Sequence, residues 1–298
     1  MAPVLVFGYK REDTLKQTLE ALNKNNSACK TDLFIFIDGP RDNSDIEKVE
    51  KVQKLVDDFC ANNSFKSVTV EQSINNKGLA VSIINGVSKI IDNYESVIVV
   101  EDDLVTSEDF IDYMNSALDY YRDDDDVGAI SGFSLKLDKK SDNNDLYIAQ
   151  TGNSWGWATW KNIWVKTDWE VTSYFDTMLS GSKRNRFEMQ QYGIAKMLDM
   201  QMEGKIDSWA VRWDYSFFER KLKTIYPYDS KVRNIGFGID ATNTLNSIDK
   251  RNDVVELKKN ISFKPSYELA DRTSDLFKGS KPSIYERLVY MMAKWRKK

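Results

Sequence analysis

The chain has 298 residues, enough for one large α/β domain or two small ones with a buried core. Hydrophobic residues make up 41% and charged residues 30%, which is too apolar for a disordered chain, and the net charge of −4 argues against a general nucleic-acid binder. There is no histidine, which excludes Ser–His and Cys–His catalysis and every histidine-containing metal site. Two cysteines, Cys29 and Cys60, are too few for a disulfide framework and favour a reducing cytosol.

Short apolar runs alternate with helical periodicity in the first half of the chain. The runs are rich in β-branched and aromatic residues and predict strands at Pro3–Gly8, Leu33–Asp38, Ser67–Val70 and Ser96–Val100. Helical stripes between them are formed by Leu15, Leu19 and Leu22, by Ile46, Val49, Val52, Val56 and Phe59, and by Ile83, Val87, Ile90 and Ile91. This alternation predicts a mostly parallel sheet with helices on both faces.

Other local patterns predict helix starts and loops. Ser44 with Glu47, and Thr106 with Asp109, have the spacing of a capping box and predict helices that begin just after residues 41 and 104. In the second half, a polar loop is expected at residues 138–145 and a basic, mobile loop at Ser180–Arg186. No composition break separates two domains, so we predict one domain followed by a helical tail.

The end of the tail, Lys281–Lys298, combines an apolar stripe with six basic residues and one acidic residue. Such an amphipathic helix can lie on an anionic membrane surface, or it can dock its apolar stripe on the domain, and the sequence leaves both open. No segment reaches the roughly 18 consecutive apolar residues that span a bilayer. We therefore expect a cytoplasmic protein, peripheral on the inner face of the membrane if the tail binds lipid.

Polar clusters follow three of the predicted strands, at Gly8–Arg11, Asp38–Arg41 and Glu101–Asp103. In an open parallel sheet, ligands bind beyond the carboxyl ends of the strands, because loops and helix amino termini converge there. Strand ends are polar in most proteins, but three such clusters on one edge favour a nucleotide or sugar-nucleotide site. The chain has no G-x-G-x-x-G and no Walker motif, so a diphosphate would be held by a metal and by basic side chains.

The triplet Glu101-Asp102-Asp103 is the most informative of these clusters. Three adjacent carboxylates repel one another, and a divalent cation relieves that repulsion. Mg²⁺ and Mn²⁺ bind through one or two carboxylates together with substrate phosphates, and would neutralise the charge on a leaving diphosphate. The alternative is a solvated acidic turn, which is our interpretation of Asp123–Asp126.

Aromatic residues mark a second candidate region, because five of the eight tryptophans lie between residues 155 and 169. Core packing is the better interpretation for Trp160, Trp164 and Trp169. Trp155 and Trp157 flank a glycine and suit core packing or stacking on a sugar ring equally.

Without histidine, a general base must be Asp, Glu, Lys or Tyr. Asp207 and Asp214 lie beside Trp209 and Trp213, and burial against an indole would raise the pKa of a carboxyl toward the useful range. The alternative is a salt bridge to a nearby basic side chain such as Arg212, and it fits Asp214 better than Asp207.

The order of these motifs resembles that of GT-A fold glycosyltransferases, above all N-acetylglucosaminyltransferase I and related bacterial sugar transferases. The motifs are Pro3–Arg11, Phe36–Gly39, Val99–Leu104, Gly156-Trp157 and Asp207–Trp209. The resemblance extends from about Ala2 to about Gly238, and Glu-Asp-Asp-Leu after an apolar strand is its most specific motif. It implies a Rossmann-like GT-A domain, residues 1–260, with a nucleotide-sugar-binding half (1–130) and an acceptor-side half (131–260), before the tail, residues 261–298.

The resemblance implies an inverting transfer from a nucleotide diphosphate sugar, usually a UDP-sugar such as UDP-GlcNAc, with Mn²⁺ or Mg²⁺ as cofactor. Asp103 would ligate the metal, and Glu101 and Asp102 would hydrogen-bond the ribose and sugar of the donor. Asp38 would contact the uracil, and Arg11 would contact the donor. The acceptor would be a saccharide or a lipid-linked saccharide.

On the acceptor side, the resemblance makes Asp207 the base that deprotonates the acceptor hydroxyl and places Trp157 near the donor sugar or the acceptor. The family often has more acid and a Met-Arg after this motif, whereas Ala210-Val211-Arg212 follows here, so Asp214 remains a rival base.

Two other functions remain open. A sugar-nucleotide nucleotidyltransferase would use the same sheet and metal, but it would carry a Gly-rich basic loop that Gly8–Arg11 matches poorly. A non-catalytic carbohydrate-binding protein would explain the tryptophans but not the acidic triplet.

Overall fold

The computed structural model describes residues 1–135, 137, 145–236, 266 and 268–279 of the chain. The strands are β1 (Val4–Gly8), β2 (Asp32–Ile37), β3 (Ser67–Gln72), β4 (Ser96–Glu101), β5 (Leu104–Thr106), β6 (Val127–Ser131), β7 (Leu146–Ala149), β8 (Trp157–Trp160), β9 (Lys223–Pro227) and β10 (Val232–Asn234). The helices are α1 (Glu12–Asn23), η1 (Ala28–Lys30), α2 (Ile46–Ala61), α3 (Leu79–Ile91), α4 (Phe110–Tyr120), α5 (Lys161–Trp164), α6 (Tyr174–Met178), α7 (Gly181–Glu188), α8 (Ile194–Met202), α9 (Trp209–Arg220) and α10 (Thr273–Gly279).

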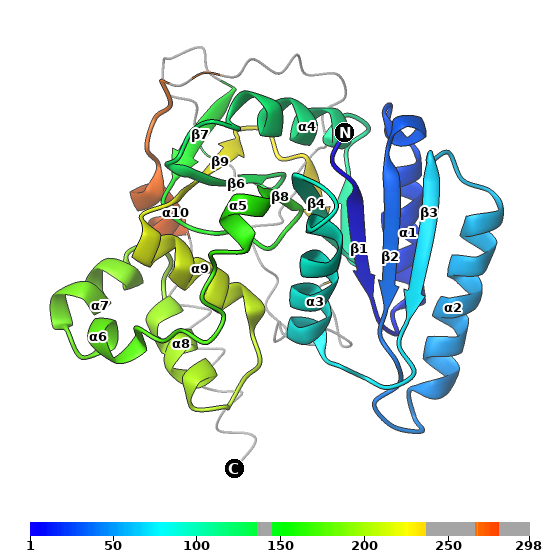
Figure 1. Cartoon of the computed structure of the whole chain (residues 1–298), viewed down its shortest axis with the longest axis horizontal. Coiled ribbons are helices and arrows are strands. Elements are labelled where there is room, and N and C mark those ends of the chain that lie inside the picture. Colours follow the sequence, from blue (N-terminus) through cyan, green and yellow to red (C-terminus); the bar gives the residue numbers. More distant parts are fainter. Residues whose placement is uncertain (136, 138–144, 237–265, 267, 280–298) are drawn as a thin grey trace.

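An eight-stranded sheet runs through the described part of the chain in the order β3-β2-β1-β4-β8-β6-β9-β7 (Figure 1). The first four strands in this order are parallel, and β6 is parallel to β9. β8 runs antiparallel to both β4 and β6, and β7 runs antiparallel to β9. The predicted α/β fold with a mostly parallel sheet is therefore confirmed.

The parallel register brings the carboxyl ends of the central strands to one edge. Gly8 pairs with Ile37, and Phe7 pairs with Glu101, so the residues that follow β1, β2 and β4 leave the sheet side by side. The four predicted strands are all present, and the apolar runs of β1 and β4 are buried because helices cover both faces.

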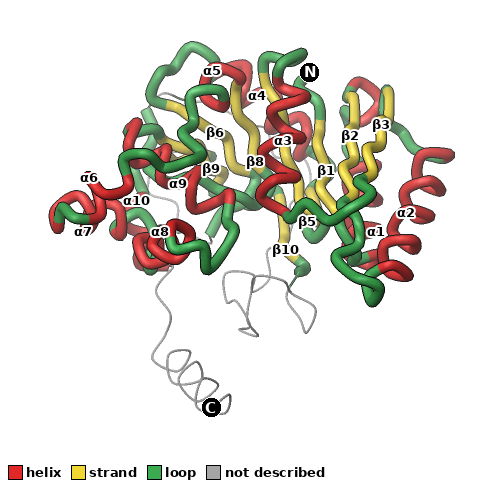
Figure 2. Tube along the Cα trace, turned by 60° about the horizontal axis from the view of Figure 1, so that its bottom comes forward, coloured by secondary structure: helices red, strands yellow, loops and turns green. Residues whose placement is uncertain are grey.

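Helices α1 and α2 pack together on one face of the sheet, and α3 lies on the opposite face with α9 (Figures 1 and 2). The close approach of α3 depends on Gly86, because a Cβ at this position would lie 2.7 Å from Cε1 of Phe7. Helix α4 joins the face of α1, where the Ile111 N–H donates to Asn25 Oδ1 over 2.9 Å. This arrangement leaves the carboxyl edge of β1, β2 and β4 uncovered by these helices.

The two predicted capping boxes do not form. Helix α2 begins at Ile46 and α4 at Phe110, and neither helix has a side-chain cap. The side chains in question have other partners, since Ser44 donates to Asp42 over 2.5 Å and Asp109 accepts from Lys231 over 2.5 Å. Because these contacts compete with capping, both helices begin several residues later in the chain than predicted.

The predicted mobile loop at Ser180–Arg186 is wrong, because most of it belongs to helix α7. Ser180 is the N-cap of this helix, and its hydroxyl accepts a hydrogen bond from the Lys183 N–H. The buried Phe187 anchors α7 in a small second core that it shares with α8 and α9. The basic residues of this segment therefore belong to a helix and not to a loop.

The described residues of the predicted tail pack on the edge of the sheet. The Arg272 N–H donates to the Ile148 carbonyl over 2.9 Å, and Gln150 N–H donates to Thr273 Oγ1 over 2.9 Å. Lys281–Lys298 and the expected polar loop at residues 138–144 lie outside the described residues. Among the described residues, none of the helices combines the length and the apolar character that crossing a bilayer requires.

Trp157 lies in the middle of a tryptophan cluster and has no exposed area. Its ring centroid is 5.7 Å from that of Trp164, 5.2 Å from that of Trp209 and 5.5 Å from that of Trp213. Because β8 is paired on both sides, its side chains face the helices that cover the sheet. The predicted contact of Trp157 with a sugar is therefore wrong, whereas the prediction of a core position for Trp160 and Trp164 is confirmed.

Replacing Trp157 should accordingly destabilise the fold. We expect Trp157→Leu to lower the free energy of unfolding by about 2–4 kcal/mol, because it removes ring contacts and leaves a cavity. Leu179→Ala is the control, since Leu179 is 82% exposed, and it should change the value by less than about 0.5 kcal/mol. Urea unfolding measures both, and equal effects of the two changes would contradict the buried position of Trp157.

Candidate active site

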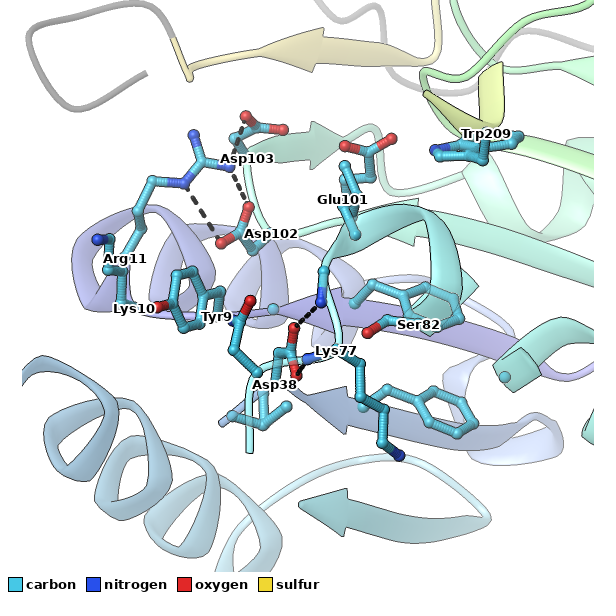
Figure 3. Close-up of a pocket in the computed structure, with 18 of the residues that line it drawn as sticks. Tyr9, Lys10, Arg11, Asp38, Lys77, Ser82, Glu101, Asp102, Asp103 and Trp209 are labelled. Atoms are coloured by element: carbon cyan, nitrogen blue, oxygen red, sulfur yellow. Dashed lines mark hydrogen bonds and ion pairs between the residues drawn. The ribbon is translucent and has the colours of Figure 1, made fainter. Parts of the chain in front are cut away.

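A pocket of 1190 Å³ opens at the carboxyl edge of β1, β2 and β4 (Figure 3). Its floor is formed by the residues that follow these strands, and its sides by the start of α3, by Trp155 and by the segment Ile206–Ala210. The pocket brings together most of the residues predicted from the sequence: Arg11, Asp38, Glu101, Asp102, Asp103 and Asp207. Trp157 and Asp214 do not line it.

Arg11 binds two of the three carboxylates of the acidic triplet. Its guanidinium donates to Asp102 from both Nε, over 3.3 Å, and Nη2, and Nη2 also lies 2.8 Å from Asp103 Oδ2. The side chains of Asp102 and Asp103 are only 7% and 12% exposed, so water screens these ion pairs weakly. Arg11 therefore offsets the repulsion within the triplet.

Glu101 is the member of the triplet that Arg11 does not reach. Among the described residues, none donates a hydrogen bond to its carboxyl group, and Figure 3 shows this group projecting into the pocket. Burial, together with the charges of Asp103 and Asp102, raises the pKa of Glu101 well above its usual range. Burial also raises the pKa of Asp102 to about 6, although the charge of Arg11 opposes this shift.

Asp38 organises the loop that precedes α3. One of its carboxylate oxygens accepts from the Gly39 N–H over 3.0 Å and the Lys77 N–H over 2.8 Å, and the other accepts from the Gly78 N–H over 2.9 Å. Gly39 is required here, because a Cβ would lie 2.6 Å from the Ile74 carbonyl oxygen. Asp38 thus shapes one wall of the pocket, and its contact with a uracil remains a prediction.

The two candidate bases occupy different environments. Asp207 is exposed in the pocket, and its carboxylate accepts a hydrogen bond from Arg212 Nη2 over 3.1 Å. Asp214 accepts from Thr151 Oγ1 over 3.0 Å, and burial raises its pKa to about 6. The expectation that a salt bridge fits Asp214 better is wrong, because Arg212 reaches back from the first turn of α9 to Asp207, two residues before the helix. Asp207 alone of the two can meet a ligand in this pocket.

A second group of residues completes the pocket and was not assigned a role from the sequence. β10 pairs with β5, and the Ile235 N–H donates to the Asp103 carbonyl over 2.8 Å. This contact brings Gly236 against the Asp103 carboxylate, where a Cβ would lie 1.9 Å from Oδ2. The only signal in the sequence was the pair of glycines at 236 and 238, which is too short for a phosphate-loop motif.

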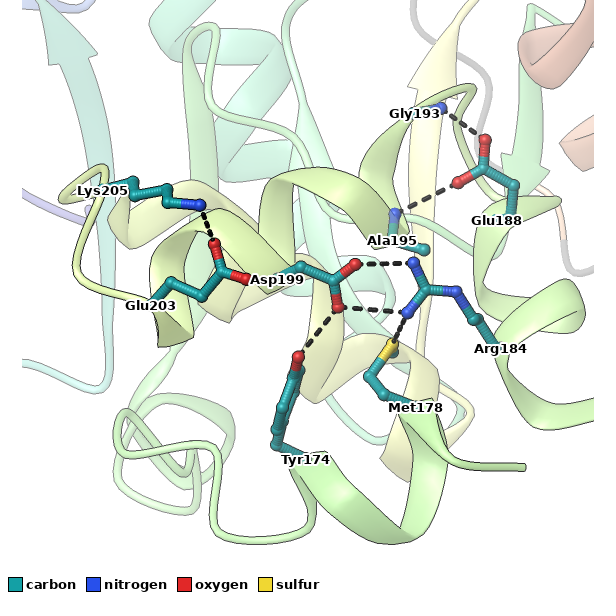
Figure 4. Close-up of polar contacts among 9 residues, drawn as sticks. All are labelled: Tyr174, Met178, Arg184, Glu188, Gly193, Ala195, Asp199, Glu203 and Lys205. Carbon is teal, nitrogen blue, oxygen red and sulfur yellow. Dashed lines mark hydrogen bonds and ion pairs between the residues drawn. The ribbon is translucent and has the colours of Figure 1, made fainter. Parts of the chain in front are cut away.

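Helix α8 lines the pocket with Met197 and Met200. Polar contacts hold α8 in place (Figure 4). Asp199 accepts from Arg184 over 2.6 Å and from the Tyr174 hydroxyl over 2.8 Å, and Glu188 accepts from two backbone N–H groups at the start of the helix. These contacts fix an apolar wall opposite the charged floor.

The acidic triplet fits a divalent cation only together with other ligands. In the part of the chain that the structure describes, no three acidic or cysteine side chains converge on one point as a metal cluster. Asp102 and Asp103 do converge on one cationic group, the Arg11 guanidinium, and the backbone of Gly236 packs closely against Asp103. One or two carboxylates completed by phosphate oxygens form a donor set that Mn²⁺ and Mg²⁺ accept. Asp123–Asp126 is largely exposed, as expected of a solvated turn.

Comparisons with known proteins find similarity of architecture alone. No family model and no curated protein sequence matches the chain. A mannosyltransferase from Pyrobaculum calidifontis in complex with GDP-Man and Mn²⁺ is 11% identical, with a TM-score of 0.41 over 74% of this chain and 69% of that chain. S. aureus TarS 1–349 is 10% identical, with a TM-score of 0.45 over 78% of this chain and 59% of that chain.

A third similar structure is 4-diphosphocytidyl-2C-methyl-D-erythritol synthase from Anaerococcus prevotii, at 12% identity and a TM-score of 0.39 over 77% of this chain and 91% of that chain. All three TM-scores are below 0.5, so these similarities carry no argument about activity. The resemblance to N-acetylglucosaminyltransferase I remains a prediction.

The buried carboxyl of Asp214 should make stability depend on pH. Its pKa is about 6 in the folded protein and 3.8 in an ordinary setting, so the folded state holds the proton more tightly. The free energy of unfolding should therefore fall as pH rises from about 4 to about 6, by an amount on the order of 2 kcal/mol relative to Asp214→Asn. Above about pH 7 the difference between the two proteins should be constant.

Urea unfolding of both proteins between pH 4 and pH 7 measures this difference. A difference that is the same at every pH would show that Asp214 is not a buried carboxyl with a raised pKa.

Proposed function

We propose that the protein is a metal-dependent glycosyltransferase that moves a sugar, with inversion, from a nucleotide diphosphate sugar to a saccharide or lipid-linked saccharide. A UDP-sugar, for example UDP-GlcNAc, is the proposed donor. The observation that carries the proposal is the convergence in one pocket of Arg11, the acidic triplet and the exposed Asp207. During a sugar transfer, negative charge develops on the leaving diphosphate and the acceptor hydroxyl loses a proton. Arg11 and a metal at the triplet would stabilise that charge, and Asp207 would accept that proton.

The donor side is the edge of the pocket formed by β1, β2 and β4. Arg11 supplies a positive charge for the diphosphate, and the pocket is also lined by the basic residues Lys10, Arg41, Lys48, Lys51, Lys77, Lys89 and Lys205. Asp103, with Asp102, would hold Mn²⁺ or Mg²⁺, which would neutralise charge on the diphosphate when bound. The loop that Asp38 orders would lie against the nucleoside.

The sugar and the acceptor fit the opposite side of the pocket. Glu101 has a carboxyl without a donor among the described residues, which suits it to accept hydrogen bonds from sugar hydroxyls. Trp155 lines the same region and is half-buried, so part of its indole can meet a sugar ring, whereas Trp209 is only 2% exposed. Figure 3 shows Arg11 and Trp209 on opposite sides of Glu101. A sugar held at Glu101 would therefore have the diphosphate on one side and the acceptor on the other, as inversion requires.

Asp207 is the proposed base. It lines the acceptor side, and Arg212 fixes the orientation of its carboxylate, so that it can accept the proton of the acceptor hydroxyl as the hydroxyl attacks the anomeric carbon. A direct-displacement step needs one base and no protein nucleophile, which agrees with the absence of histidine from the chain.

UDP should stabilise the protein only in the presence of metal. We expect UDP with Mn²⁺ to raise the melting temperature by several degrees, because the cation links Asp103 to the diphosphate, and we expect each alone to have little effect. Asp103→Asn should abolish the joint effect, whereas Asp123→Asn, at the solvated turn, should retain it. Differential scanning fluorimetry measures these shifts.

Other outcomes distinguish the other functions. Stabilisation by glycans but not by UDP would indicate a carbohydrate-binding protein. Release of pyrophosphate from a nucleoside triphosphate and a sugar phosphate would indicate a nucleotidyltransferase.

Asp207→Asn should separate binding from chemistry. The amide keeps the size of the side chain but cannot take a proton, so we expect unchanged binding of UDP and Mn²⁺ and a loss of transfer or donor hydrolysis of at least about 100-fold. Asp214→Asn is the matched control and should retain activity. Full activity of Asp207→Asn would assign the base to another residue.

A further inference from the structure

Arg11 already binds the two carboxylates that we propose as metal ligands. Its Nη2 bridges the carboxylates of Asp102 and Asp103, and the Arg11 side chain is 22% exposed at the pocket surface. Gly236 closes the other side of this contact, since a Cβ there would lie 3.0 Å from Arg11 Nη1. The two carboxylates are therefore already partly neutralised by a cation that belongs to the chain itself.

A divalent cation and this guanidinium would repel each other if both bound Asp103. At contact distance, the repulsion between a doubly charged ion and a guanidinium at a protein surface is several kcal/mol. The repulsion is relieved if the guanidinium leaves Asp103, or if an anion arrives between the two positive groups. A diphosphate is such an anion, and Arg11 lies where it can bind one bidentately.

Part of the Arg11 side chain is open to the pocket, since it is 22% exposed, so a ligand in the pocket can reach it. Arg11 immediately precedes helix α1, and its carbonyl accepts from the Leu15 N–H over 3.1 Å, which fixes the backbone but not the side chain. Asp102 can keep the guanidinium nearby through its contacts with Nε and Nη2. Only the contact with Asp103 has to break.

We infer that Arg11 is an internal cation that holds the metal-binding carboxylates in the free protein, and that metal and nucleotide diphosphate displace it from Asp103 together. This inference rests on the proposed function. It makes the binding of the two ligands cooperative. By linkage, UDP must then raise the affinity for Mn²⁺ by the same factor as Mn²⁺ raises the affinity for UDP.

The test measures Mn²⁺ binding directly, from the electron paramagnetic resonance signal of free Mn²⁺, without any turnover. Arg11→Gln removes the internal cation and should bind Mn²⁺ about tenfold more tightly than the wild type in the absence of nucleotide. UDP should strengthen Mn²⁺ binding strongly in the wild type and only weakly in Arg11→Gln. Arg11→Lys, which keeps the charge but loses the fork of donors, should fall between the two.

Lys10→Gln is the matched control. It removes one positive charge from the adjacent pocket residue, which pairs with Asp45 over 2.5 Å and not with the triplet. Its affinity for Mn²⁺ should stay within about twofold of the wild-type value, because a local ion pair and not the overall charge sets the effect.

The possible results separate the inference from the function on which it rests. Equal or weaker Mn²⁺ binding by Arg11→Gln, with the usual gain from UDP, would overturn the inference and leave the metal-dependent transferase intact. Absence of Mn²⁺ binding in all variants, even with UDP, would overturn the metal site and the proposed function together. If Arg11→Gln does not fold, as circular dichroism would reveal, the comparison of Arg11→Lys with Lys10→Gln decides the question.

Discussion

The ion pairs of Arg11 with Asp102 and Asp103 are the interaction on which the site depends. Three consecutive carboxylates at the end of a buried strand would repel one another in a region from which water is largely excluded, and the guanidinium offsets that repulsion. The parallel register of β1 and β4 makes the contact possible, because it places the residue after β1 next to the residues after β4. The sheet and the charge cluster therefore support each other.

The remaining elements surround this cluster in two groups. The loop ordered by Asp38 and the end of β10 both approach it, and each depends on a glycine, Gly39 or Gly236, to come close enough. Helices α8 and α9 line the side where we propose that the acceptor binds, and Arg212 in the first turn of α9 holds Asp207. A charged floor and an apolar wall thus face each other across one pocket, which suits a ligand that joins a diphosphate to a sugar.

The sequence predicted the half of the molecule whose signals are local. The runs before Gly8 and Glu101 are strongly apolar, so their strands and the convergence of their polar ends could be predicted. Trp157 could not be placed, because its exposure depends on β8 pairing on both sides with strands distant in the chain. Gly236 was missed for the same reason, since only the pairing of β10 with β5 brings it to Asp103. The partner of Arg212 depended on where α9 begins, because Asp207 precedes the helix and Asp214 lies within it.

A crystal structure with UDP and Mn²⁺, read from the anomalous signal of manganese, tests the central claim most directly. We expect one manganese peak in contact with the Asp103 carboxylate and the diphosphate, and an Arg11 guanidinium that has left Asp103 for the phosphate oxygens. A manganese ion bound away from Asp103, or bound UDP with Arg11 still bridging both carboxylates, would contradict it.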